Sequence, residues 1–430
     1  MSDIKITVRD FRAIHSADID LNGITVIAGV NGSGKSTLSK LLYTIFDKVK
    51  SLDDIYWHVF RLEIHPIEEI CQQIYDTLKP ANVDYLFGIG AKQLRKDIQQ
   101  AVSLLADSYS QDDRINRLVS IIKYNLGIEI KDREDLSLIL DRFDETLAKY
   151  EEKKKNRPFK ELANEMASVF HEENIAEKVS ISEYGYTFFG PGVESVPLLH
   201  SVKFCTYMDT PKQLEWPFFS NEWKHINDSK YALNHQEINQ YLSEKILKGE
   251  TAYSEKSSSL IYRRNDGKTF DLSESATGVQ AFAFLQLLLK NGLNDRSLII
   301  IDEPEAHLHP QWIVEYAKVL VELNKKTKAR FFLATHSTDM VSALRYIAEK
   351  EETLNHLSFY RAVPSDVDAY TYDYQNMGTD IEPIFESFNK SYELIEKYGT
   401  DNGPIQPLET AIRGNPSVSL YDSDRIQEVV

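Results

Sequence analysis

The sequence is poor in cysteine and lacks any long apolar run. Only two of its 430 residues are cysteines, Cys71 and Cys205, which excludes a disulfide framework and fits a reducing compartment. No stretch approaches the ~18 consecutive apolar residues that a membrane-spanning helix needs. The N-terminus shows no charged-then-apolar pattern of a secretion signal. We therefore expect a cytoplasmic protein with no membrane partner.

Basic residues are also in short supply. The chain has 49 Lys and Arg against 66 Asp and Glu, a formal net charge of −17. This balance argues against a surface devoted to nucleic acid, although a local basic groove is compatible with it. The hydrophobic content of 42% is that of a globular protein. The length suggests about two or three domains.

What the chain does contain is a phosphate-binding loop, Gly-Val-Asn-Gly-Ser-Gly-Lys-Ser, at residues 29–36. Its glycines permit the tight turn that directs backbone N–H groups at phosphate oxygens. Lys35 brings positive charge to the β- and γ-phosphates, and the Ser36 hydroxyl can ligate Mg²⁺. The apolar run 24–28 predicts a strand before the loop, and 36–43 predicts a helix after it. We expect ATP and Mg²⁺ as cofactors, bound through Gly29, Asn31, Gly32, Ser33, Gly34, Lys35, Ser36 and Thr37.

A second motif places two acids after a buried strand. Residues 298–301 are four apolar residues in a row, and Asp302 and Glu303 follow them. In an α/β fold the carboxyl ends of parallel strands form the edge where ligands bind. We predict that Asp302 holds Mg²⁺ together with Ser36, and that Glu303 polarises the attacking water. Alone, the pattern would fit a solvated acidic turn, but the phosphate loop favours the functional interpretation.

The third motif has the same form. The apolar run 331–334 ends in Thr335 and His336, so His336 is expected at the same edge of the sheet, in reach of the γ-phosphate or the water. A lone histidine is more often structural, but the strand end favours a function. The predicted catalytic residues are therefore Lys35, Glu303 and His336.

A fourth segment, 272–280, opens a strongly apolar helix expected over 275–290. Ser275, Thr277 and Gly278 could present hydroxyls, backbone N–H groups and the positive end of the helix dipole to a phosphate. A plain serine N-cap explains the same residues. Residue types alone favour the cap.

The remaining pattern predicts an α/β fold with a mainly parallel sheet. Expected strands cover 4–8, 17–21, 179–189, 202–207, 258–262, 269–272, 298–301, 331–334 and 357–362, and expected helices cover 132–150, 159–170, 234–247, 275–290, 311–324 and 338–350. Because the phosphate loop and the other motifs are far apart, residues 51–254 are predicted to form a large, mostly helical insertion. Residues 1–50 and 255–400 then form the nucleotide core, and 401–430 a tail.

In this order the motifs resemble ABC-type ATPases, in particular the SMC, RecF and OLD-like AAA branch. The residues that carry the resemblance are the phosphate loop, the run Asp-Glu-Pro-Glu-Ala-His-Leu-His-Pro at 302–310 and Thr-His-Ser at 335–337. The resemblance implies a P-loop NTPase fold of the ABC type. It also implies that 275–280 stands where that family has its signature motif, which caps the γ-phosphate of ATP held by a second subunit.

Further expectations come from the same resemblance. Phe11 and Arg12 are expected near the nucleotide. His307 and His309 fall in a subunit-contact loop, and as a metal pair they lack a third ligand. The glutamine that couples the Mg²⁺ site to the inserted domain is not identified; Gln72 and Gln73 are weak candidates.

The overall pattern is similar to the stand-alone ATPase subunit of two-component bacterial anti-phage systems of the Septu-like or PARIS-like kind. This similarity implies a regulatory ATPase that forms a homodimer or higher homo-oligomer around ATP and controls a separate nuclease or toxin. The alternative is a RecF- or SMC-like DNA-binding ATPase in repair. It needs a basic groove, for which Lys153–Lys155, Arg263, Arg264, Lys325, Lys326 and Arg330 are the candidates. A transporter ATPase fits less well, because the insertion is too large.

Overall fold

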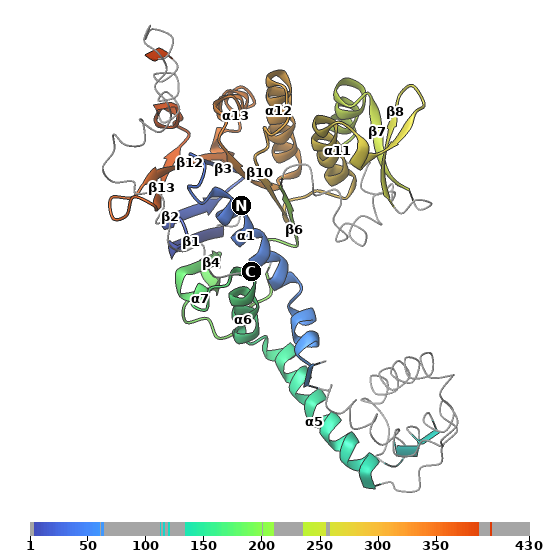
Figure 1. Cartoon of the computed structure of the whole chain (residues 1–430). Helices are drawn as coiled ribbons and strands as arrows, with labels where there is room; N and C mark the ends of the chain where they lie inside the picture. Colours follow the sequence, from blue (N-terminus) through green and yellow to red (C-terminus); the bar gives the residue numbers. More distant parts are fainter. Residues whose placement is uncertain are drawn as a thin grey trace, which may run out of the picture. The chain divides into compact units, whose positions relative to one another are not determined.

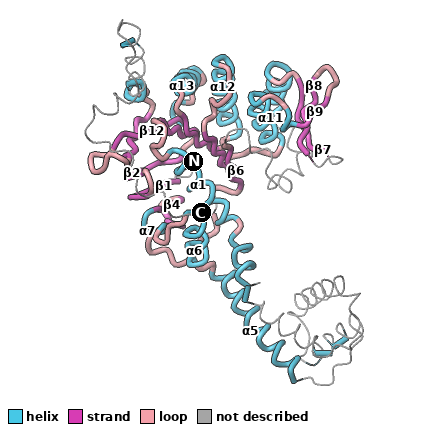
Figure 2. Tube along the Cα trace, in the orientation of Figure 1, coloured by secondary structure: helices cyan, strands magenta, loops and turns pink. Residues whose placement is uncertain are grey.

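The computed structural model describes residues 4–60, 134–199, 201–209, 235–254 and 259–386, with isolated positions between and after these ranges. It falls into two units, Met1–Ile381 and Glu382–Val430, and the elements below belong to the first. They comprise a ten-stranded sheet and a separate three-stranded sheet, with helices around them (Figures 1 and 2). None of the helices described is long and apolar enough to cross a membrane.

One half of the large sheet is parallel. Its order is β12-β3-β11-β10-β6, with β3 (Ile24–Ala28), β6 (Phe204–Met208), β10 (Ser297–Asp302), β11 (Arg330–Thr335) and β12 (Leu357–Pro364). Every residue of β3, β10 and β11 is buried, as expected for strands covered on both faces. The helices that connect them include α1 (Lys35–Lys50), α12 (Pro310–Thr327) and α13 (Thr338–Lys350). The predicted α/β fold is confirmed.

The other half is mostly antiparallel. Its order is β5-β4-β1-β2-β13, with β1 (Ile4–Phe11), β2 (Ile14–Leu21), β4 (Val179–Glu183), β5 (Tyr186–Phe189) and β13 (Tyr372–Gly378). β13 pairs antiparallel with β12 and parallel with β2, so it joins the two halves. The prediction that 357–362 is the last strand was wrong. Only Tyr374 of β13 is buried, so its sequence lacks the apolar alternation that marks a strand.

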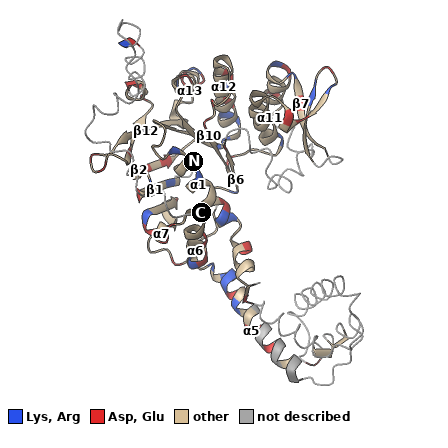
Figure 3. Ribbon diagram, viewed as in Figure 1, with Lys and Arg blue, Asp and Glu red and all other residues tan. Residues whose placement is uncertain are grey.

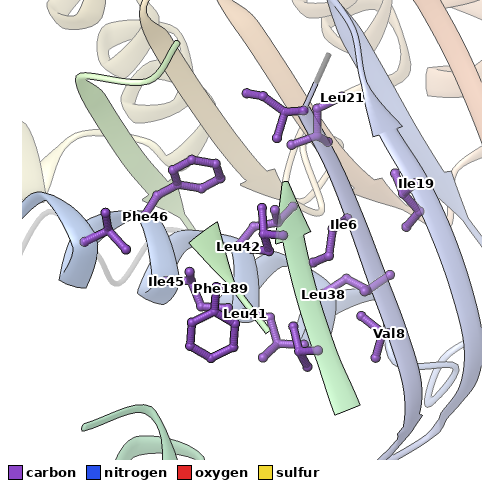
Figure 4. Packing of buried hydrophobic residues seen from close by; sticks show 14 of the residues in the cluster. Ile6, Val8, Ile19, Leu21, Leu38, Leu41, Leu42, Ile45, Phe46 and Phe189 are labelled. Carbon is purple, nitrogen blue, oxygen red and sulfur yellow. The ribbon is translucent and has the colours of Figure 1, made fainter. Parts of the chain in front are cut away.

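Helix α1 forms the centre of the core. Leu38, Leu41, Leu42 and Ile45 recur at helical spacing and are fully buried. Figure 4 shows these residues among side chains of β1, β2 and β5. The helix also contacts β6, β10 and β11. The helix that begins at the phosphate loop is therefore anchored on both halves of the sheet.

The three-stranded sheet lies beside helix α11 (Thr277–Lys290). It contains β7 (Gly249–Ser254), β8 (Ser259–Arg264) and β9 (Thr269–Asp271), and is preceded by α10 (Gln236–Tyr241) and a π-helical turn, Leu242–Ile246. The predicted strands 258–262 and 269–272 are confirmed as β8 and β9, which form an antiparallel hairpin, whereas β7 was not predicted. Buried Gln286 of α11 accepts from the Thr251 backbone N–H at 2.8 Å and donates to Ser243 Oγ at 2.9 Å. This amide ties the helix to the sheet.

Several helices and strands fall within residues 51–254. The helices include α5 (Glu134–Asn156), α6 (Phe159–Phe170) and α7 (Ile175–Lys178). Strands β4, β5 and β6 pair into the large sheet, so part of this stretch belongs to the sheet itself. The division into core, insertion 51–254 and tail 401–430 stays a prediction; the tail lies outside the described residues.

Candidate functional site

The phosphate loop joins β3 to α1, and close packing requires glycine at two of its positions, Gly29 and Gly34. A Cβ on Gly34, which has φ = 92°, would lie 2.8 Å from Ile14 Cγ1. A Cβ on Gly29 would lie 2.8 Å from Ala362 Cβ. The Tyr374 hydroxyl donates to the Ser33 carbonyl at 2.7 Å. Residues of β2, β12 and β13 therefore pack directly against the loop.

Lys35 is held inside the loop. Only 6% of the residue is exposed, and its Nζ donates to the carbonyls of Gly29 and Val30 at 2.9 Å each. Burial lowers the pKa of the Lys35 ammonium, while the carboxylates of Asp302 and Glu303 oppose that shift. In contrast, Asn31, Gly32 and Ser36 are exposed, and Thr37 is half-buried. The loop thus presents its backbone and the Ser36 hydroxyl outward over a buried positive charge.

Asp302, at the end of β10, is 4% exposed. Burial raises the pKa of its carboxyl, and hydrogen bonds from Ser36 and Tyr207 partly offset that effect. No hydrogen-bond partner reaches Oδ1 from the part of the chain that the structure describes. A buried carboxylate oxygen in need of a partner, beside a serine hydroxyl, suits a hard cation such as Mg²⁺. Asp302 and Ser36 are therefore brought together as predicted from the sequence.

Glu303 follows in a left-handed backbone conformation, with φ = 53°. Its N–H donates to the Ala334 carbonyl at 2.8 Å, which fixes the turn against β11. Such a conformation in a residue other than glycine is uncommon, and it often marks a functional position. Glu303 Oε1 lies 3.6 Å from Nδ1 of His336, and both side chains are about 40% exposed. The two predicted catalytic side chains thus lie next to each other at an accessible edge.

Glu305 has a role that the sequence did not suggest. Its side chain is 7% exposed, and Oε1 accepts from Thr335 Oγ1 at 2.7 Å and from the His336 backbone N–H at 3.0 Å. The same Oε1 lies 3.5 Å from His336 Nδ1. Glu305 therefore fixes the acidic loop to the end of β11. The sequence signal for this role was the second acid of the Glu-Pro-Glu run. Its hydrogen-bond partners are 30 or more residues away along the chain, so the sequence alone did not reveal them.

The start of α11 differs from the N-cap interpretation. The cap position is Ala276, without a side-chain hydrogen bond, and the helix begins at Thr277. Ser275 Oγ instead donates to the Asp271 carbonyl at 3.3 Å, so the prediction of a serine N-cap was wrong. A Cβ on Gly278 would lie 2.8 Å from Trp312 Cζ3. The side chains nearest Gly278 thus come from α12 and the loop before it.

The other predicted residues lie as follows. Phe11 is fully buried and meets the Phe170 ring edge-on at 6.0 Å. Arg12 donates from Nη2 to the Phe170 carbonyl at 3.1 Å. Both are therefore engaged with α6, and their contact with a nucleotide stays a prediction. Gln72 and Gln73 lie outside the described residues.

His307 and His309 are exposed, and His309 Nδ1 accepts from the Gln311 backbone N–H at 3.4 Å to cap α12. Within the described ranges, no group of three or more His, Cys, Asp or Glu side chains could hold a metal ion. Nothing supports a histidine metal site here.

Comparison with known proteins gives the family. Residues 24–342 match the family described as "AAA domain, putative AbiEii toxin, Type IV TA system". This span is most of the chain and contains every motif above, so the chain belongs to that AAA-domain family.

Solved structures with similarity to the chain include SMC heads and an ABC cassette. The SMC head domain from Thermotoga maritima is 12% identical, with 88% of this chain and 99% of that chain covered and a TM-score of 0.36. An Smc head domain bound to the C-terminal domain of ScpA, derived from Pyrococcus furiosus, is also 12% identical. The match covers 93% of this chain and 100% of that chain, with a TM-score of 0.36. The ADP conformation of MJ1267, an ATP-binding cassette of an ABC transporter, is 12% identical. The match covers 93% of this chain and 100% of that chain, with a TM-score of 0.33.

Proposed function

We propose that this chain is an ATP-hydrolysing regulatory ATPase that dimerises around ATP and controls a separate effector protein in bacterial anti-phage defence. The observation that carries the enzymatic part is the convergence of Lys35, Asp302, Glu303 and His336 at one edge of the sheet. The defence part is supported by the family, whose description names a toxin of a type IV toxin–antitoxin system. We place the protein in the cytoplasm.

ATP binding rests on the phosphate loop. The exposed backbone around Asn31 and Gly32 offers N–H groups at the N-terminus of α1, where the helix dipole favours an anion. Lys35 exchanges its contacts with two loop carbonyls for contacts with the β- and γ-phosphates. Mg²⁺ held by Ser36 and Asp302 would neutralise charge on the phosphates.

Hydrolysis rests on Glu303 and His336. Glu303 accepts a hydrogen bond from the attacking water and takes up the proton that the water loses as its oxygen attacks the γ-phosphate. His336 orients the water or the γ-phosphate. Glu305 keeps the His336 backbone in place through the 3.0 Å hydrogen bond. Positioning of this kind is the main contribution that a protein makes to phosphoryl transfer.

The dimer rests on the N-terminus of α11. Ser275 and Thr277 are half-buried, and the residues between and before them are exposed, so hydroxyls and helix N–H groups are accessible to a phosphate. The nearest neighbours of Gly278 belong to its own chain's α12 region. We propose that this N-terminus caps ATP bound to Gly29–Ser36 of a second copy.

The alternative, a DNA-binding repair ATPase, loses support from charge pairing. Lys153 lies 3.3 Å from Glu161, and Lys325 lies 2.7 Å from Glu351. Lys326 pairs with Glu237, Arg264 pairs with Asp266 and Arg330 is buried. Figure 3 shows blue and red mixed along the described elements. Four of the eight basic candidates thus pair with neighbouring acids, and a fifth is buried.

Three measurements test the proposal. The purified chain should hydrolyse ATP in the presence of Mg²⁺. Cells that carry the chain with its neighbouring gene should resist phage, and the same cells with Lys35→Ala should not. DNA binding should be weak and should not follow the steep salt dependence of phosphate contacts. Strong, salt-sensitive DNA binding without phage resistance would favour the repair ATPase.

A further inference from the structure

Tyr207, on β6, touches the candidate metal ligand but has no part in the mechanism above. Its hydroxyl lies 3.4 Å from Asp302 Oδ2 and also hydrogen-bonds the Asp209 carboxylate. A phenol is protonated at neutral pH, so the Tyr207 hydroxyl can serve as a hydrogen-bond donor to either carboxylate.

Two contacts fix the Tyr207 ring. β6 pairs in parallel with β10, and Tyr207 stands opposite Ile300, two residues before Asp302. The ring stacks on Tyr43 with centroids 5.7 Å apart and planes 27° apart. Tyr43 lies on α1, the helix that begins with Lys35. The phenol is thus held in place by the pairing of its own strand with β10, which carries the acidic motif, and by its stack on the helix of the phosphate loop.

We propose that Tyr207 is a positioning residue for the cation site, an inference that rests on the proposed function. By donating to Oδ2 it orients the Asp302 carboxylate, and Oδ1, which lacks a partner among the described residues, faces the cation. Partners behind a metal ligand commonly set its orientation in this way. The 3.4 Å separation exceeds the ~2.8 Å of a typical O–H···O hydrogen bond. With the Asp302 carboxylate held by a cation, the phenol would donate to Oδ2 in preference to Asp209.

The test uses Tyr207→Phe in the full chain, because phenylalanine keeps the stack on Tyr43 and removes only the donor. The readouts are Mn²⁺ binding to the ADP-loaded protein, followed by electron paramagnetic resonance, and ADP affinity in EDTA. Mn²⁺ affinity should fall about 10-fold or more, while ADP affinity in EDTA stays at the parental value. The matched control is Tyr346→Phe, an exposed tyrosine on α13, which should change neither.

The inference is overturned if Tyr207→Phe binds Mn²⁺ as tightly as the parent, or if its ADP affinity in EDTA falls in parallel. A parental chain that binds no ADP would refute the proposed function and, with it, this inference.

Discussion

The edge of the phosphate loop and the N-terminus of α11 are built in opposite ways. At the loop edge three polar side chains are buried: Ser33 is 0%, Lys35 6% and Asp302 4% exposed, and the Lys35 ammonium already donates to two loop carbonyls. At α11 the polar groups around Ser275 and Thr277 are accessible, and the buried contact is that of Gly278 with Trp312. The difference supports the proposal that the first region binds ATP and that the second completes the site of another copy.

The largest effect is expected from Lys35→Ala. It removes the charge that meets the β- and γ-phosphates, so ATP affinity should fall at least ~100-fold, equivalent to the ~3 kcal/mol of a charge-assisted hydrogen bond. Isothermal titration with ATP measures it. Lys40→Ala removes an exposed lysine from the same helix and should bind ATP normally. Parental affinity in Lys35→Ala would refute the loop assignment.

Glu303→Gln should separate binding from turnover. The amide keeps the size of the side chain but cannot draw a proton from water, so hydrolysis should fall about 10²–10⁴-fold. ATP affinity should be retained, and ATP should hold the dimer closed in analytical ultracentrifugation. Glu173→Gln, an exposed acid outside the site, is the control. Turnover at the parental rate would show that Glu303 does not position the water.

Gly278→Ala tests the α11 side alone. Its Cβ would lie 2.8 Å from the Trp312 ring, so the start of the helix or the ring must shift, at a cost of about 1–3 kcal/mol. ADP binding should be unchanged, because the loop is untouched, whereas ATP-dependent dimerisation and turnover should fall roughly 10-fold or more. Adding Trp312→Leu should restore part of both. Loss of ADP binding in Gly278→Ala would mean that the two regions are not separate.

Thr335→Val should give a smaller effect. It removes the 2.7 Å hydrogen bond to the buried Glu305 carboxylate, at a cost of about 1–3 kcal/mol. The midpoint of thermal unfolding should fall, and turnover should drop as His336 loses its support. Thr7→Val, which breaks an exposed 2.9 Å hydrogen bond to Asp18 in the other half of the sheet, should change stability little and turnover not at all.

Without metal, Asp302→Asn should give the smallest effect on stability among these variants, and it should stabilise the fold rather than weaken it. Burial raises the pKa of Asp302 in the folded chain, so the folded state holds this proton more tightly than the unfolded state. The stability that the protonated carboxyl contributes is therefore lost as pH rises through the folded pKa. At pH 8 without metal, Asp302→Asn should raise the unfolding midpoint by a few degrees, and the gain should vanish at low pH. An unchanged or lower midpoint at pH 8 would contradict the burial argument.

The sequence predicted the parallel half of the fold well. β10 and β11 are runs of large apolar residues, and burial on both faces leaves a signal that any window detects. The helices 159–170 and 338–350 end where predicted. β13 was missed because its sequence, Tyr-Asp-Tyr-Gln-Asn-Met-Gly, is held by pairing with β12 and β2 rather than by burial.

For the candidate site, the sequence pointed to residues within motifs. It missed Tyr207 and the contacts of Glu305, which join residues far apart along the chain. Asp302, Glu303 and His336 follow apolar strands, so local pattern suffices for them. Tyr207 is 95 residues from Asp302, and only the register of β6 on β10 brings them together. Glu305 lay within a recognised motif, but its role depends on which backbone groups β11 presents. Strand register is a property of the folded sheet that one sequence does not display.

The most direct test of the central claim mixes two impaired variants of the chain. Lys35→Ala has a damaged loop and an intact α11 N-terminus, whereas Gly278→Ala has the reverse. If ATP is held between the loop of one copy and α11 of another, the mixed dimer contains one intact site, and the mixture should hydrolyse ATP faster than the two variants measured apart. A mixture no more active than the sum of its parts would place both elements around ATP within one chain and contradict the account.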